Sequence, residues 1–188
     1  VAAVACILLA VTGVFVFVPS LGGGIMGGEF TQTMRMLHRV LAVPFILVPL
    51  FAVLKSPAGF VHLFKEDIFG KWDKDDVTWA MKFPFYLFAP GKVHMPPQHH
   101  VKSAQRLADG ALLFFCIMLA LSGIVLWLNT GFPTGSGLKV DFAPETLLLA
   151  HLVHDVFFFL TVFVGIAHIY LGAGIFQPYR GTARIMFG

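Results

Sequence analysis

Three histidines lie within one long apolar run, residues 146–174, with the sequence TLLLAHLVHDVFFFLTVFVGIAHIYLGAG: His151, His154 and His168. The run is long enough to cross a bilayer as a helix. An ionisable side chain in such a segment is costly and marks a functional site by default. Neutral imidazole binds iron and other transition metals, so the chemistry that this pattern indicates is metal ligation.

The spacing of the histidines selects one pair. His154 and His168 are 14 residues apart, so on a helix they face within about 40° of each other and lie roughly 21 Å apart along the axis. This places one imidazole near each edge of a hydrocarbon core roughly 30 Å thick, as two metal centres stacked across a membrane would require. His151 is 17 residues from His168, which turns the two side chains about 100° apart. We therefore predict that His154 is a ligand and that His151 is not.

A second apolar segment, about residues 34–54, carries His38 near its start. A b-type haem needs two imidazoles from neighbouring helices at the same depth. His38 lies about one turn into its segment, and His154 lies about two turns into its own from the same side. We predict that these two bind one iron, whereas His168 at the opposite edge needs a partner from the first apolar segment.

Two arginines, Arg35 and Arg39, flank His38 at positions i−3 and i+1. Guanidinium groups there could pair with haem propionates. They could equally be interfacial anchors of a membrane helix.

The composition indicates an all-α integral membrane protein. The 188 residues are 57% hydrophobic and 12% charged, with a mean hydropathy of +0.83. The net charge of +3 is small and scattered, which argues against a nucleic-acid partner. Cys6 and Cys116 lie inside apolar runs without a C-x-x-C motif, so zinc, iron–sulfur and c-type haem sites are not indicated.

The chain reads as a single transmembrane domain, residues 1–188, folded as a four-helix membrane bundle. The predicted spans are listed by number: about 1–18, 34–54, 105–128 and 146–174, with a long loop at 55–104. Ten of the 13 Lys and Arg residues lie between Lys55 and Arg106 or in the C-terminal tail. The positive-inside rule therefore places the loop and the tail in the cytoplasm. The first run begins without Met, charge or cap, which predicts that the natural N-terminus lies further upstream.

Three segments, MRMLHRV with His38, LLLAHLVHDVFFFLTVFVGIAHIY with His154 and His168, and QRLADGALLFFCIMLALSGIVLW, resemble the cytochrome b (gamma) subunit of membrane-bound formate dehydrogenases. That subunit belongs to a wider di-haem cytochrome b family that also serves nickel–iron hydrogenases. The resemblance covers nearly the whole chain. It implies two haem b groups in a multi-pass subunit of the bacterial inner membrane. It also implies that the subunit takes electrons from an iron–sulfur subunit and passes them to menaquinone or another quinone of the respiratory chain. A separate catalytic subunit completes the complex that the resemblance implies.

The resemblance extends to the quinone pocket and to the ligand that His168 lacks. The family uses an Asn and a Gln at the start of the third span to bind quinone; Gln105 matches the Gln, whereas Lys102 stands at the Asn position. The family's first span opens with a His-Trp pair before an apolar run that ends in Thr/Ser-Gly. Here that run reaches Thr12-Gly13, so the histidine would fall two positions before Val1.

Other functions remain open at this point. The same spans would suit a cytochrome b subunit of a hydrogenase or of a thiosulfate reductase-type complex. A non-haem membrane anchor with structural histidines is a further alternative. A proton-coupled transporter would need acids at mid-depth, and neither Asp109 nor Asp155 is clearly there. In the cytochrome b readings the chain is an electron-transfer subunit, and the catalytic subunit is another protein.

Overall fold

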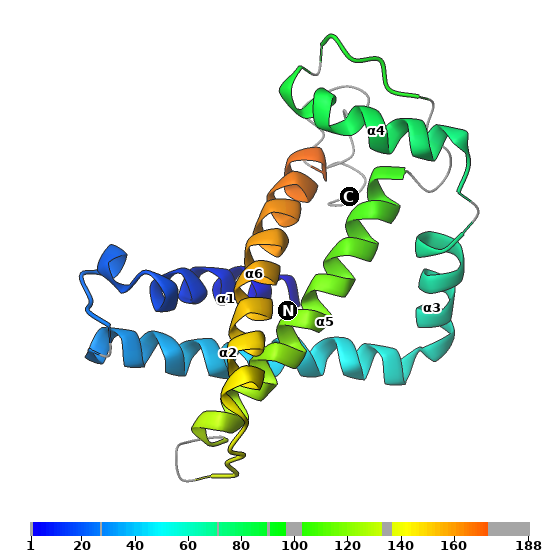
Figure 1. The fold of residues 1–188 in the computed structure, drawn as a ribbon. Coiled ribbons are helices and arrows are strands. Elements are labelled where there is room, and N and C mark those ends of the chain that lie inside the picture. The colour runs from blue at the N-terminus through cyan, green and yellow to red at the C-terminus, as the bar shows by residue number, and fades with distance from the viewer. Residues whose placement is uncertain are drawn as a thin grey trace. The chain divides into compact units, whose positions relative to one another are not determined.

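The computed structural model describes residues 2–26, 28–70, 72–89, 91–96, 103–132 and 137–172, and the secondary-structure elements among them are helices joined by turns and loops. An isolated bridge between Phe132 and Leu138 is the extended pairing among these residues. The elements in chain order are the helices α1 (Ala2–Phe17), α2 (Glu29–Lys55), α3 (Pro57–His62), α4 (Lys74–Phe88), α5 (Ser103–Thr130) and α6 (Pro144–Gly172), with a 3₁₀ turn η1 (Pro19–Gly22) and a π-helical turn η2 (Leu63–Ile68) (Figure 1). The predicted all-α class is confirmed.

Three of the helices are long and apolar enough to cross a membrane: Glu29–Lys55, Arg106–Thr130 and Pro144–Tyr170. Helix α1 is also apolar, but at 16 residues it is shorter than the roughly 20 residues of a typical span. The predicted first span, and with it the four-helix bundle, therefore stays a prediction.

Helix α2 differs from its predicted bounds. It begins at Glu29 rather than near residue 34, because the polar stretch EFTQT is helical although it is not apolar. Hydropathy detects only the apolar part of such a helix. The helix also continues through Pro44 and Pro49 to Lys55. A proline removes one backbone donor and bends a helix, and membrane helices tolerate this where other groups satisfy the freed carbonyls.

The chain divides into two compact units, and α5 and α6 contribute to both. The first consists of Val1–Pro57 and Met118–Phe158, and the second of Ala58–Ile117 with the chain from Phe159 onward. The first unit contains the α1–α2 hairpin, the second half of α5 and the first half of α6.

The hairpin between α1 and α2 is held by contacts at its turn. Gly23 follows η1 with a φ of 72°, in the left-handed region that glycine adopts without strain. The ring of Phe15 on α1 meets Phe30 on α2 edge to face, with centroids 5.7 Å apart. The fully buried Thr31 donates through Oγ1 to the carbonyl of Ile25 at 2.7 Å. These contacts fix the register in which α1 faces α2.

The second unit is organised around α4. Asp73 caps this helix: its Oδ1 accepts from the amides of Asp75 and Asp76, and Asp76 Oδ2 accepts in return from the Asp73 amide at 3.1 Å. The buried Asp76 also accepts a hydrogen bond from the hydroxyl of Ser103, the first residue of α5. The buried side chains Trp79 and Tyr86 form the apolar core of this unit. Residues 74–88, which lie within the predicted loop 55–104, thus form a capped helix that is packed on one side.

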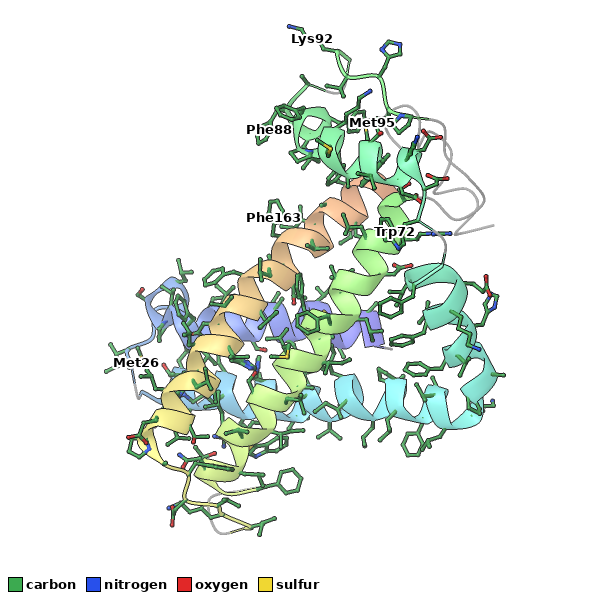
Figure 2. The ribbon with its side chains drawn as sticks, turned by 45° about the vertical axis from the view of Figure 1, so that its right-hand side comes forward. Met26, Trp72, Phe88, Lys92, Met95 and Phe163 are labelled. Atoms are coloured by element: carbon green, nitrogen blue, oxygen red, sulfur yellow. The ribbon has the colours of Figure 1, made fainter. Side chains whose placement is uncertain are left out.

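Many large apolar side chains among the described residues are exposed. Phe163 on α6 is 64% exposed and Phe88 at the end of α4 is 90% exposed, and both project outward from their helices (Figure 2). Among the described residues, the buried apolar ones are Ala5, Trp79, Tyr86 and Ala150. A soluble chain would not leave so much apolar surface in water. Lipid is the solvent that suits this surface.

Candidate haem site

The candidate site lies in the first unit, where α2 and α6 bring two imidazoles together. The ring centroids of His38 and His154 are 6.2 Å apart, with an interplanar angle of 72°. His38 follows the first residue of α2 by nine positions, and His154 follows the first residue of α6 by ten. At about 1.5 Å per residue the two lie about 14 and 15 Å from their helix starts. Both side chains are half-buried.

Each imidazole contacts a hydroxyl on a different helix. Thr12 Oγ1 on α1 lies 3.0 Å from His38 Nδ1, and Ser122 Oγ on α5 lies 3.0 Å from His154 Nδ1. Both hydroxyl residues are buried, at 7% and 6% exposure. Four helices thus form two equivalent pairs, α1 with α2 and α5 with α6. In each pair one helix carries the histidine and the other carries the hydroxyl.

A glycine follows each hydroxyl residue and leaves space beside the ring. A Cβ on Gly13 would lie 3.5 Å from His38 Cε1 and 3.5 Å from Phe158 Cε2. A Cβ on Gly123 would lie 3.3 Å from His154 Cε1 and 3.7 Å from its Nδ1. A larger side chain at either position would occupy the space next to the imidazole.

Comparison with models of known protein families shows the family of the chain. The family model described as "Prokaryotic cytochrome b561" matches residues 1–188, the whole chain. The chain belongs to the prokaryotic cytochrome b561 family. No curated protein matches the chain significantly in sequence. With its three apolar helices, this member of the family is a multi-pass membrane cytochrome, and the family implies that it binds haem b.

The paired imidazoles of this cytochrome fit a haem iron. A metal–imidazole bond is about 2 Å long and the nitrogen lies about 1.1 Å from its ring centre, so two imidazoles that held one metal ion would have centroids up to about 6 Å apart. The observed separation of 6.2 Å agrees with this. The hydroxyls contact Nδ1, which leaves Nε2 of each ring for the metal. The glycines beside both rings leave room for a flat group.

The structure brings His38 and His154 together, while their role as iron ligands stays a prediction. His38 lies deeper in its helix than the sequence suggested, because α2 begins at Glu29. His151 lies one turn before His154 and is exposed. His168 lies near the end of α6, in the second unit, and is half-buried. Its role as a ligand of a second haem therefore also stays a prediction.

The two arginines beside His38 are both half-buried. Arg39 donates through Nη2 to Thr130 Oγ1, the last residue of α5, at 2.9 Å. This bond ties α2 to α5 within the first unit. The role of Arg35 at a haem propionate is not tested by these contacts.

The two residues predicted to bind quinone are not placed in a site. Gln105 lies in the first turn of α5, where the backbone is described but the side chain is not. Lys102 lies outside the described residues. The loop histidines His99 and His100 also lie outside them, whereas the His94 carbonyl accepts from Lys82 Nζ at 3.0 Å.

Sequence reasoning missed Thr12 and Ser122 as histidine partners. A signal was present, because Thr12-Gly13 and Ser122-Gly123 are the same hydroxyl–glycine dipeptide in the first and third apolar helices. Each dipeptide precedes a helix that carries a histidine. The apolar sequences around them share no obvious repeat, so the relation between the two hairpins was visible only in space.

Proposed function

We propose that this cytochrome is the membrane-anchoring electron-transfer subunit of a respiratory oxidoreductase. In this proposal it carries electrons from an iron–sulfur subunit of a formate dehydrogenase-like complex to menaquinone or another quinone. The family membership supports a membrane haem b electron carrier, and the formate donor rests on the resemblance of the histidine-bearing segments. Primary substrate oxidation belongs to a separate catalytic subunit.

The observation that carries the proposal is the pair of facing imidazoles, 6.2 Å apart, each contacted at Nδ1 by a hydroxyl. In this proposal Nε2 of His38 and Nε2 of His154 hold one haem b. Bound there, haem b supplies a one-electron carrier inside the membrane. The hydroxyls orient the rings, and the adjacent glycines keep side chains out of the space that the haem occupies.

A second haem, with His168 as one ligand, belongs to the same proposal. The spacing of 14 residues between His154 and His168 supports it, because it separates two centres by roughly 21 Å along one helix. Gln105 and Lys102, at the start of α5, are proposed to hold the quinone head group. Quinone reduction takes two electrons and two protons, so this site needs both a haem and a route to water nearby.

The donor decides between two related functions. Membership of the family is equally consistent with a hydrogenase and with a formate dehydrogenase. The test is a reduced-minus-oxidised spectrum of the purified complex after addition of formate or of hydrogen gas. Reduction of a haem b band by formate supports the proposal, and reduction by hydrogen alone assigns the chain to a hydrogenase. A protein that contains no haem b would be a non-haem anchor, and the proposal would fail.

A further inference from the structure

The two hydroxyl–imidazole contacts have the same geometry although they come from separate hairpins. Thr12 Oγ1 and Ser122 Oγ each lie 3.0 Å from the Nδ1 of a histidine, at sequence separations of 26 and 32 residues. Because the two sequence separations differ, a shared loop length does not explain the equal distances. Both contacts are made to Nδ1, and Nε2 is the nitrogen proposed to hold the metal.

The direction of each hydrogen bond follows from the proposed iron ligation together with the hydroxyl's own partners. A hydroxyl has one proton to donate. Thr12 Oγ1 donates to the Leu8 carbonyl at 2.9 Å, and Ser122 Oγ donates to the Met118 carbonyl at 2.7 Å. Both acceptors lie four residues earlier on the same helix. If Nε2 of each ring holds the iron, as the proposed function has it, the ring proton is on Nδ1, and the hydroxyl oxygen accepts it while its own proton goes to a carbonyl of its helix.

We propose that Thr12 and Ser122 are positioning residues that set the reduction potential of the haem held by His38 and His154. The inference rests on the proposed function, because it assumes that these imidazoles are the iron ligands. Accepting a hydrogen bond from Nδ1–H makes the ring a stronger electron donor to the metal. A stronger donor stabilises ferric iron more than ferrous iron. A neutral hydroxyl does this less than a carboxylate would, so the potential is held at an intermediate level.

The magnitude can be bounded. Groups that orient and polarise a metal ligand typically change metal affinity by about 10- to 100-fold when they are removed. If one hydroxyl changes the ferric-over-ferrous preference by about tenfold, its loss raises the potential by about 59 mV for a one-electron carrier. Removal of both hydroxyls should raise it further, because the two contacts act on separate ligands.

The competing explanation is that the hydroxyls only satisfy carbonyls of their own helices. Thr33 on α2 provides the matched control. Its Oγ1 donates to the Glu29 carbonyl at 2.9 Å, again four residues earlier, and its side chain is exposed. Thr33→Val therefore removes the same intrahelical bond without removing a bond to an imidazole.

The experiment is a redox titration of the haem b band in the purified complex, with the haem-to-protein ratio measured on each sample. Thr12→Val and Ser122→Ala should each raise the midpoint potential of one haem. Thr12→Ser and Ser122→Thr keep the hydroxyl, so the midpoint potential should stay at the wild-type value. Thr33→Val should leave it unchanged. Thr12→Cys and Ser122→Cys keep a side chain of similar size with a weaker acceptor. Each should raise the midpoint potential less than Thr12→Val and Ser122→Ala do.

Each outcome decides something. A potential that is unchanged in the haem-loaded Thr12→Val, Ser122→Ala double variant overturns the inference and leaves the proposed function intact. An equal rise in Thr33→Val also overturns it, because a general helix effect would then explain the shift. If the double variant loses its haem, the cysteine variants decide by the same criterion. A wild-type protein without haem b defeats the proposed function itself.

Discussion

Replacement of Gly123 by valine should weaken haem binding at the His38–His154 pair. A Cβ on Gly123 would lie 3.3 Å from Cε1 of His154, closer than an ordinary van der Waals contact. The ring would have to move by a few tenths of an ångström to accept even alanine. The two γ-carbons of valine extend the side chain by about another 1.5 Å, about one carbon–carbon bond.

The magnitude follows from the packing around the ring. Overpacking of a filled site costs about 1–3 kcal/mol. If that cost falls on the ligand-bearing form, haem binding weakens by about 5- to 150-fold, at about tenfold for each 1.4 kcal/mol. Gly123→Ala should change haem binding much less than Gly123→Val, because the ring has to move by only a few tenths of an ångström.

Gly165 on α6 is the matched control, since a Cβ there would meet nothing within 4 Å. Gly165→Val carries the same intrinsic cost of a β-branched residue in a helix. The assay is the haem-to-protein ratio of each variant after purification, followed by titration of the depleted protein with haem. Equal haem binding by Gly123→Val and Gly165→Val would refute the claim that the glycine shapes the haem site.

Three further predictions concern topology, the quinone and the second unit. Reporter fusions near Asp75 should report the cytoplasm, and fusions within residues 131–137 should report the outer side, because the basic residues cluster in the long loop and the tail. The reverse result would exchange the cytoplasmic and outer faces of the protein. Gln105→Ala should slow the reoxidation of reduced haem by a menaquinone analogue, while the donor still reduces the haem. Lys102→Ala should slow this reoxidation to a smaller extent. Normal reoxidation in the double variant would place the quinone elsewhere. Asp76→Ala should lower the free energy of unfolding by about 2 kcal/mol or more, since it removes a capping bond and leaves the buried Ser103 hydroxyl without its acceptor. Thermal unfolding in detergent measures this, and a loss no larger than that of Thr78→Ala, which removes an exposed intrahelical bond, would contradict it.

The helices were largely predictable because apolar composition over 20 residues is a strong signal in membranes. Their ends were not, because polar residues such as the EFTQT stretch of α2 continue a helix without adding hydropathy. For the first helix, hydropathy predicted a complete span where the structure has a shorter helix. Its residues are apolar throughout, yet 16 of them do not by themselves make a span.

The sequence predicted that His38 and His154 lie close together, and it did not predict the groups that surround them. Helical periodicity favoured His154 over His151, and in the structure His154 faces His38 while His151 is exposed. Thr12 and Ser122 could not be assigned from periodicity, because serine and threonine are common in membrane helices and usually bond to their own helix. Only the packing of α1 on α2 and of α5 on α6 showed that their oxygens contact Nδ1.

The most direct test of the central claim is the haem b content of His154→Ala measured beside that of His151→Ala. The two histidines lie one helical turn apart on the same helix, so general effects on folding and insertion are matched. The account predicts that His154→Ala loses a haem, that His38→Ala loses the same one, and that His151→Ala retains the wild-type amount. A His151→Ala variant that loses haem while His154→Ala retains it would contradict the account.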